Sequence, residues 1–262
     1  MSFIKSKTTL IQGTVKKAID VSRYSSCTLR SENAHVVSVL QTGKVIANAP
    51  GETIVWVEEK GRIVYALHCH VLADEKTKTL PLLLNRYNRI HAPVGDLKTL
   101  PECYCAPKKT IELETATAES FAALCEAAKA ENGIWIYANQ GYRSLEAQEQ
   151  IIAYYTKREG HEAACKRCAP VGFSEHHSGL AIDVGGGRYE DTEQMPDREA
   201  VYEWVAQNSY RFGFFLKNLK GKEHITGTRY EPWHIRYLGD ETICRILYEK
   251  QITLDEYLDI YE

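Results

Sequence analysis

The pattern of hydrophobic residues changes near residue 75, and this change divides the chain into two domains of different class. Before it, runs rich in β-branched residues alternate with turn pairs such as Thr42-Gly43 and Pro50-Gly51 about every 8–12 residues. This pattern is typical of a small antiparallel sandwich. The segment Ala73–Thr79 is polar and lacks periodicity. We therefore expect an all-β domain over residues 1–74, a linker at 75–79 and a second domain over 80–262.

The second domain combines helical and strand patterns, which predicts an α+β fold with a central antiparallel sheet. Ser144 is suited to cap a helix that Gly160 ends. Apolar spacing predicts further helices over about 117–130, from about Asp197 to Arg211, and from near Asp240. Strands are expected at Ile134–Ala138, Leu180–Val184 and His234–Leu238, with the run Gly185-Gly186-Gly187 ending the second.

The first domain resembles the bacterial Ig-like (group 2) repeat. The resemblance is carried by Ser31, Asn33, Val36, Val39, Gly43, Val45, Ala47, Gly51, Thr53 and Val57, at the spacing typical of that repeat. It implies an Ig-like sandwich that acts as a wall- or surface-attached spacer or adhesion unit.

Charge and hydropathy exclude some classes of function. The chain has 32 Lys and Arg against 35 Asp and Glu, so no overall positive field would attract nucleic acid. The longest apolar runs, such as Leu80–Leu84, are far shorter than the ~20 residues of a membrane-spanning helix. No secretory signal is recognisable in this sequence. We expect no nucleic-acid partner and no membrane span in this chain.

The cysteine pattern gives little support for a structural metal site. Cys103-x-Cys105 and Cys165-x-x-Cys168 are the close pairs among eight cysteines, and a structural zinc site needs two such halves. Isolated thiols or a local disulfide are favoured. His68 and His70 alternate on one strand and could face one ion. Two ligands are too few, so a strand with polar outward positions is the preferred interpretation.

The densest group of metal-capable side chains lies between Ser174 and Asp183, and Glu231-Pro232-Trp233-His234 follows about fifty residues later. Hydrolytic zinc sites take three N or O ligands and leave a fourth position for water. Two histidines and a carboxylate meet this requirement, and a further carboxylate could accept a proton from that water. His176 and Asp183 are seven residues apart, so a bend at Ser178-Gly179 is needed to bring them together.

Three motifs in this region resemble the zinc D-Ala-D-Ala carboxypeptidases of the VanY type (M15, or LAS, peptidases). Residues 174–183 match the family motif SxHxxGxAxD. Tyr230–His234 contains its EPWH element, and Gly141–Gln148 contains its GYRSxxxQ element. The resemblance covers about residues 80–262, with the motifs in the family's order.

The resemblance implies a role for each matching residue. Zinc would bind His176, Asp183 and His234, and Glu231 would be the catalytic base. Arg143 would contact the scissile carbonyl or the terminal carboxylate of the substrate. The resemblance places Gln148 and Ser174 beside it as candidate substrate-binding residues. Tyr142 and Trp233 complete the candidate substrate-binding set as walls of the pocket or part of the core, with no part in the chemistry. His177 stands where the family often has another polar residue, and its role is left open.

The predicted function is zinc-dependent removal of the C-terminal D-alanine from peptidoglycan stem peptides, in cell-wall remodelling or glycopeptide resistance. The alternatives are an L,D-carboxypeptidase or D,D-dipeptidase of the same family, and a catalytically silent wall-binding protein. We expect Zn²⁺ as cofactor, stem peptides as partners, a monomeric chain and an extracellular or wall-associated location.

Overall fold

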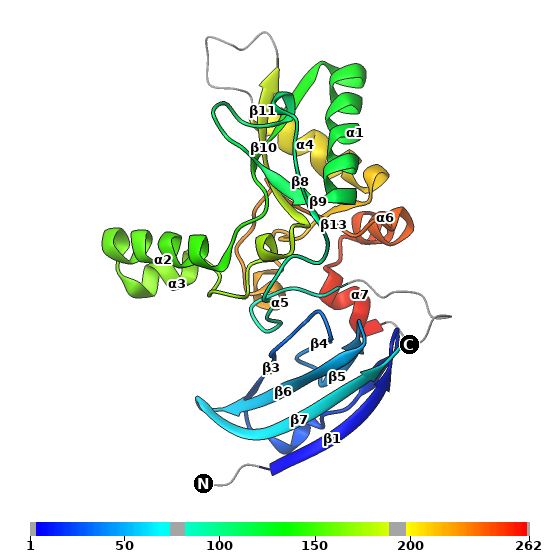
Figure 1. Cartoon of the computed structure of the whole chain (residues 1–262), viewed down its shortest axis with the longest axis vertical. Helices are drawn as coiled ribbons and strands as arrows, with labels where there is room; N and C mark the ends of the chain where they lie inside the picture. Colours follow the sequence, from blue (N-terminus) through cyan, green and yellow to red (C-terminus); the bar gives the residue numbers. More distant parts are fainter. Residues whose placement is uncertain (1–3, 74–81, 189–197, 261–262) are drawn as a thin grey trace. The chain divides into compact units, whose positions relative to one another are not determined.

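The computed structural model describes residues 4–73, 82–188 and 198–260, and the chain divides into two compact units (Figure 1). The first unit comprises residues 1–91, 169–174 and 254–262. The second comprises residues 92–168 and 175–253. The predicted linker at 75–79 lies outside the described residues. Within the described ranges, no helix has both the length and the apolar character to cross a membrane.

The first unit is built from two sheets. One has the strand order β1-β7-β6-β3 and the other β2-β5-β4. Their pairing is antiparallel except that β1 runs parallel to β7. Alternate residues such as Leu29, Val57 and Leu67 form its buried core. The strands are β1 (Ile4–Ile11), β2 (Val15–Lys17), β3 (Cys27–Ser31), β4 (Val37–Val39), β5 (Lys44–Ala47), β6 (Gly51–Glu59) and β7 (Arg62–Leu72).

Helix α7 (Leu254–Ile260), which the sequence pattern did not predict, groups with the first unit. Asn85 Nδ2 donates to Asp255 Oδ1 at 2.8 Å, and Thr42 Oγ1 donates to Asp259 Oδ1 at 2.8 Å. Residues at the end of the chain thus pack with residues near its beginning. The sequence predicted independently folding domains over residues 1–74 and 80–262. Whether these two parts fold independently stays a prediction.

The second unit is organised around the antiparallel sheet β10-β11-β13-β12, in agreement with the expected α+β class. Its strands are β8 (Leu97–Thr99), β9 (Glu112–Glu114), β10 (Ile134–Gln140), β11 (Ala181–Arg188), β12 (Phe214–Leu216) and β13 (His234–Tyr237). Its helices are α1 (Thr115–Asn132), α2 (Leu145–Glu159), α3 (His161–Arg167), α4 (Arg198–Asn208), α5 (Glu223–Thr226) and α6 (Glu241–Lys250). Short 3₁₀ turns include η3 (Glu175–Ser178) and η5 (Ser209–Phe212).

Local capping explains where the main helices begin and end. Ser144 Oγ accepts from the Ala147 amide at the start of α2, as its sequence position predicts. Asp240 caps α6 in the same way through the Ile243 amide. Gly133 ends α1 in the left-handed conformation, at φ 64°.

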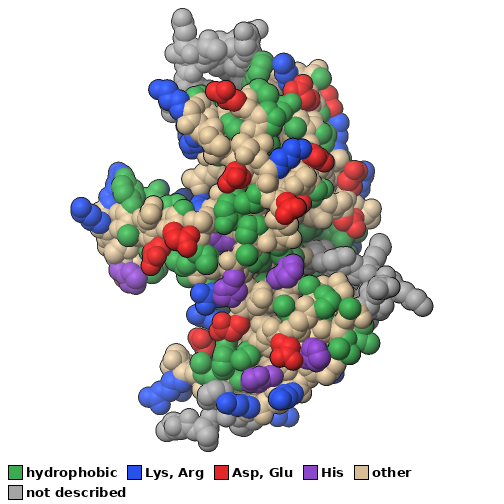
Figure 2. Space-filling model, in the orientation of Figure 1, with side chains coloured by type: hydrophobic (Ala, Val, Ile, Leu, Met, Phe, Trp, Pro, Cys, Tyr) green, Lys and Arg blue, Asp and Glu red, His purple; other side chains and the backbone are tan. Residues whose placement is uncertain are grey.

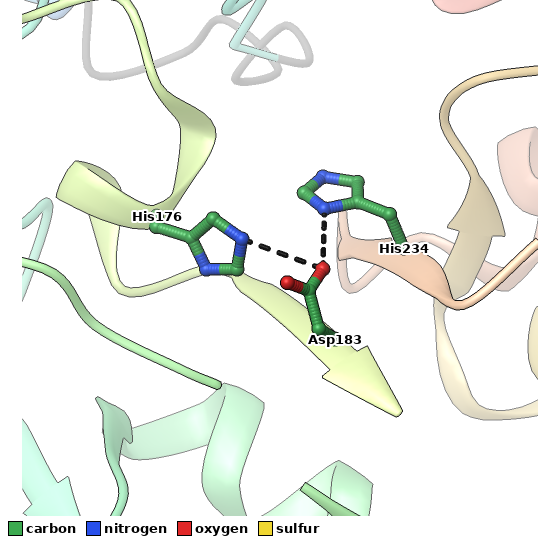
Figure 3. Close-up of side chains that lie close together, drawn as sticks. All are labelled: His176, Asp183 and His234. Atoms are coloured by element: carbon green, nitrogen blue, oxygen red, sulfur yellow. Dashed lines mark hydrogen bonds and ion pairs between the residues drawn. The ribbon is translucent and has the colours of Figure 1, made fainter. Parts of the chain in front are cut away.

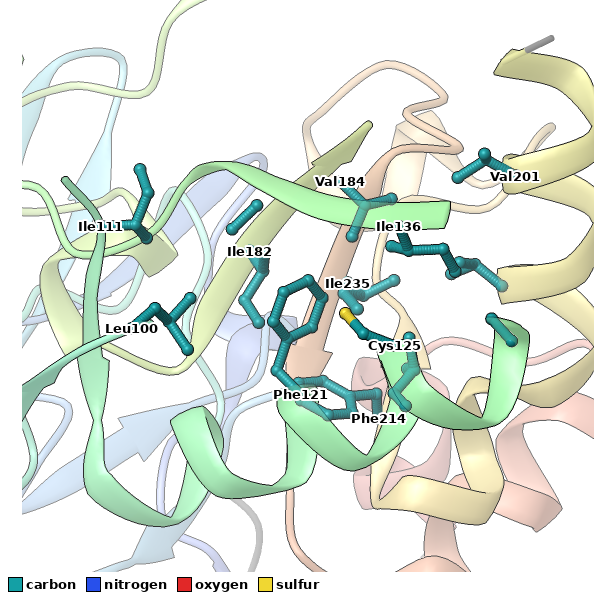
Figure 4. Close-up of a cluster of buried hydrophobic side chains, with 14 of the residues drawn as sticks. Leu100, Ile111, Phe121, Cys125, Ile136, Ile182, Val184, Val201, Phe214 and Ile235 are labelled. Carbon is teal, nitrogen blue, oxygen red and sulfur yellow. The ribbon is translucent and has the colours of Figure 1, made fainter. Parts of the chain in front are cut away.

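The core of the second unit lies between its sheet and helices α1 and α4 (Figure 4). Phe121 of α1 packs edge-on against Phe214 of β12, with ring centroids 6.5 Å apart. Ile182, Val184 and Ile235 supply buried side chains from β11 and β13. On each unit, the face seen in Figure 2 carries charged side chains of both signs, in keeping with the net charge of −3.

The prediction that Gly185-Gly186-Gly187 ends its strand is wrong, because β11 continues to Arg188. Gly186 pairs with Ile136 of β10 at φ 139°. A Cβ atom at this position would lie 1.9 Å from the carbonyl oxygen of Trp135. The glycine run therefore allows close approach of two strands instead of ending one of them.

We expect Gly186→Ala to lower the free energy of unfolding by about 3 kcal/mol, because the new methyl group meets backbone that cannot rotate away. Gly133→Ala is the matched control: its φ is also positive, at 64°, but nothing lies within 4 Å of an added Cβ. The control should cost only about 1 kcal/mol. Urea denaturation measures both changes, and equal losses would contradict the steric explanation.

Candidate metal centre

Sheet register places two of the predicted ligands opposite each other. Asp183 of β11 and His234 of β13 are direct cross-strand partners, so their side chains project from the same face of the sheet. His176 lies on η3, immediately before the bend at Gly179, where φ is 78°. A left-handed backbone at this point favours glycine, and the predicted bend at Ser178-Gly179 is confirmed.

The three side chains converge as Figure 3 shows. Asp183 Oδ1 lies 3.0 Å from His234 Nδ1 and 3.5 Å from His176 Nε2. The two imidazole rings are 5.1 Å apart, centroid to centroid. Over residues 4–73, 82–188 and 198–260, this is the one group of three or more His, Cys, Asp or Glu residues whose ligand atoms all lie within 4.8 Å.

Hydrogen bonds select which nitrogen each histidine presents. His176 Nδ1 donates to the carbonyl oxygen of Gly141 at 2.7 Å, which leaves Nε2 for the centre. His234 Nε2 donates to Glu175 Oε2 at 3.0 Å, which leaves Nδ1. Metal-binding histidines commonly hold their second nitrogen in this way.

The charges of the centre fit a divalent cation. Burial alone would raise the pKa of Asp183, but His176 and His234 outweigh burial and hold it well below the usual range. Burial lowers the pKa of His176, which favours the neutral, ligand-competent ring. Once His234 has given up its proton, two neutral imidazoles and a carboxylate would form the donor set, and the present separations of 3.0 and 3.5 Å from Asp183 Oδ1 to the two ring nitrogens suit the about 2.0–2.2 Å bonds of tetrahedral zinc.

Glu231 is held beside the ligand strand by a turn. The His234 amide donates to the Glu231 carbonyl oxygen at 3.1 Å, which is the turn that Pro232 predicted. Asn218 Nδ2 donates to Glu231 Oε2 at 2.9 Å, and Arg229 Nε lies 3.7 Å from Oε1. No ligand atom of the cluster comes from Glu231, which leaves its carboxylate available as a base.

Arg143 is partly buried, and two glutamine side chains hold its guanidinium. Nη1 donates to Gln148 Oε1 at 2.8 Å, and Nη2 donates to Gln140 Oε1. Burial lowers the pKa of Arg143, while the charges of Asp183 and Glu231 act in the opposite direction. This interaction places the guanidinium within electrostatic range of both the metal centre and the predicted base.

The other predicted residues occupy varied positions. His177 is buried, and its Nδ1 donates to the Arg143 carbonyl oxygen at 2.6 Å, so it supports the GYRS segment and is not part of the metal cluster. Tyr142 is half-buried. Trp233 packs against Tyr202, with the two ring centroids 6.2 Å apart. Ser174 is buried and groups with the first unit. Gln148 is buried against Arg143, and its direct contact with substrate stays a prediction.

Several residues of the centre were not identified from the sequence. Glu175 occupies a position that the first motif leaves unspecified. Its place next to two histidines in the sequence was the one feature that could have indicated a role at the metal centre. Gln140 and Asn218 lie outside all three motifs, and no feature of the sequence indicated a role for them. All eight cysteines lie within the described residues and none is in a disulfide, which is one of the two arrangements that the sequence left open. His68 and His70 are not among the clustered ligands of the described residues.

The antiparallel sheet and its donor set define a mononuclear zinc site of the kind found in metallohydrolases. Residues 110–240 match the family described as VanY, D-alanyl-D-alanine carboxypeptidase. The chain belongs to this family, and its cofactor is zinc.

Similar proteins support this assignment. The putative carboxypeptidase YodJ of Bacillus subtilis is 35% identical over 154 residues, or 58% of this chain and 55% of that protein. The structure of the LdcB LD-carboxypeptidase superposes with a TM-score of 0.60 at 28% identity, covering 69% of this chain and 86% of that one. A VanY D,D-pentapeptidase in complex with Zn(II) gives a TM-score of 0.55 at 30% identity, covering 67% and 97%. The matches span 35–55% of the length of three curated relatives and 64% of that of a fourth.

We expect zinc binding to release about one proton from His234. Burial alone would lower the pKa of this ring, but its hydrogen bonds to Asp183 and Glu175 raise it to about 10 in the metal-free protein. His234 is therefore protonated at neutral pH, and zinc takes the place of the proton on Nδ1. Zinc affinity should rise with pH up to about 10. Calorimetry in buffers of different ionisation enthalpy measures the release, and a proton count of zero would contradict it.

Proposed function

We propose that this protein is a zinc-dependent carboxypeptidase that removes the C-terminal D-alanine from peptidoglycan stem peptides. The observation that carries the proposal is the assembly of His176, Asp183 and His234 near Arg143, whose guanidinium interacts electrostatically with both Asp183 and Glu231. This set contains a metal site, a carboxylate that is not one of its ligands and a cation for an anionic substrate. The name of the family and those of the solved relatives support the same substrate class.

Zinc, when bound, would supply a Lewis acid that activates water and polarises the scissile carbonyl. Glu231 would accept the proton from the attacking water and later return it to the leaving amine. The Asn218 amide holds Oε2 of Glu231 at 2.9 Å, which fixes the orientation of the base. Among the described residues, the partner of Glu231 Oε1 is Arg229, at the longer distance of 3.7 Å, so we assign the proton transfer to this oxygen.

Arg143 would recognise the free carboxylate that defines the end of the substrate. A planar guanidinium binds a carboxylate through two parallel hydrogen bonds, which an ammonium group cannot reproduce. Gln140 and Gln148 fix the plane of this group before substrate arrives. The N-terminus of α2 begins at Leu145, directly after the Ser144 cap, and adds a favourable field for an anion.

Two alternatives differ in substrate or in activity. An L,D-carboxypeptidase or a D,D-dipeptidase would use the same metal chemistry, and the solved relatives include both an LD-carboxypeptidase and a D,D-pentapeptidase. A silent wall-binding protein would be expected to lack a ligand or the base. All four residues are present here, which favours the enzyme.

We also propose a role for the first unit. Its two sheets and buried core are consistent with an Ig-like module that serves as a spacer or wall-contact domain. We place the protein outside the cell or at the wall, where its substrate occurs, and propose that it acts as a monomer.

The reaction is tested with synthetic stem peptides that end in D-Ala-D-Ala or in a single D-Ala, with mass spectrometry of the products. Loss of one alanine from the first peptide supports D,D-specificity, and loss from the second supports L,D-specificity. Glu231→Gln should lower kcat by at least about 10²–10⁴-fold, because the general base is removed. Zinc content should be unchanged in this variant. Loss of zinc with Glu231 would mean that this carboxylate is a ligand.

Recognition of the substrate's end is tested by amidating the peptide. We expect amidation to reduce kcat/KM steeply in the wild type, because Arg143 loses its anionic partner. Arg143→Lys should not restore cleavage of the free peptide, since a single ammonium cannot make the paired hydrogen bonds. An enzyme that cleaves free and amidated peptides equally well would be an endopeptidase, and the carboxypeptidase proposal would then be abandoned.

A further inference from the structure

Glu175 is a buried carboxylate beside the metal centre that the proposed chemistry does not use. Its side chain is only 6% exposed. Its two oxygens have different partners: Oε2 accepts from His234 Nε2 at 3.0 Å, and Oε1 accepts from Arg236 Nη1 at 2.7 Å. Lys217 Nζ lies 3.8 Å from Oε1. Glu175 is thus fixed from both sides.

The surroundings of Glu175 explain how a carboxylate can be held there. Arg236 is 0% exposed and Lys217 is 3% exposed, so both cations are removed from water together with the anion they contact. Buried charges need such partners, because an unpaired one is strongly destabilising. Arg236 is on the same strand as His234, and Glu175 directly precedes His176 in the chain. The carboxylate therefore links the elements that carry the two histidine ligands.

The two histidines are held by partners of different strength. His176 uses a neutral backbone carbonyl, Gly141, for its second nitrogen. His234 uses the carboxylate of Glu175. A carboxylate partner both fixes the ring and makes the opposite nitrogen a stronger donor to a metal. His234 would bind zinc through Nδ1, and without Glu175 nothing among its described hydrogen bonds would hold the Nε2–H tautomer.

We propose that Glu175 is a positioning residue of the zinc centre, which selects Nδ1 of His234 as the ligand atom, with Arg236 and Lys217 as its counter-ions. The inference rests on the zinc chemistry of the proposed function and is independent of the substrate. Glu175 touches neither substrate nor metal in this arrangement. Its effect reaches the centre through one imidazole ring.

The test replaces Glu175 with glutamine and measures zinc affinity by competition with a chromophoric chelator. We expect Kd for zinc to rise about 10–100-fold, the usual effect of removing such a partner. Long-range ¹H–¹⁵N NMR of the zinc-loaded protein gives a second readout. The wild type should show His234 protonated at Nε2 and His176 at Nδ1, and Glu175→Gln should change the His234 signals while leaving those of His176.

Two further variants make the result decisive. Glu175→Gln leaves two buried cations near an uncharged amide, so Glu175→Gln with Lys217→Met serves as a second variant in case the single one does not fold. Glu131→Gln is the matched control, because Glu131 also binds an arginine, Arg211, at 2.8 Å but on the exposed surface. The control should bind zinc as the wild type does. Unchanged zinc affinity together with unchanged His234 signals in the folded Glu175 variants would overturn the inference. Peptide cleavage is not a readout, so failure of the proposed substrate remains a separate result.

Discussion

The metal centre depends on the register between β11 and β13. Because Asp183 pairs with His234, and Gln140 of β10 pairs with Asp183 across the other edge of β11, three functional side chains form one row across the sheet. Alternate residues of the same strands, such as Ile182 and Ile235, face the hydrophobic core. A slip of one residue would exchange the two sets. The same packing that stabilises the unit therefore assembles the zinc ligands.

A second constraint is the balance of buried charge around this row. Three acidic side chains lie in this region, those of Asp183, Glu175 and Glu231. Each is held in place by a different set of neighbouring side chains. The adjacent residues Lys217 and Asn218, which follow β12, serve two of them: Lys217 faces Glu175, and Asn218 holds Glu231. One short segment thus supports both the carboxylate that orients a ligand and the carboxylate assigned as base.

The parts of this structure that could be predicted are those with a local physical cause. Ser144 and Gly160 mark the ends of α2 because capping is a property of a few neighbouring residues. The zinc ligands were predicted because the residues around them resemble the motifs of a zinc peptidase family, and because two histidines and a carboxylate suit a hydrolytic zinc site. Glu175, Asn218 and Gln140 were missed because their roles arise only when distant segments meet. The glycine run was misread for the same reason: its function is the close approach of β10, which residues 185–187 alone do not reveal.

The path of the chain has a mechanical consequence. The N-terminal strands and α7 both belong to the first unit, while the unit that holds the metal centre is formed from the two intervening stretches, 92–168 and 175–253. If the two ends of the chain were pulled apart, the force would act first on the β-sheets of the first unit and on α7. The ligand row on β11 and β13 would bear load only after contacts such as Thr42 with Asp259 had given way.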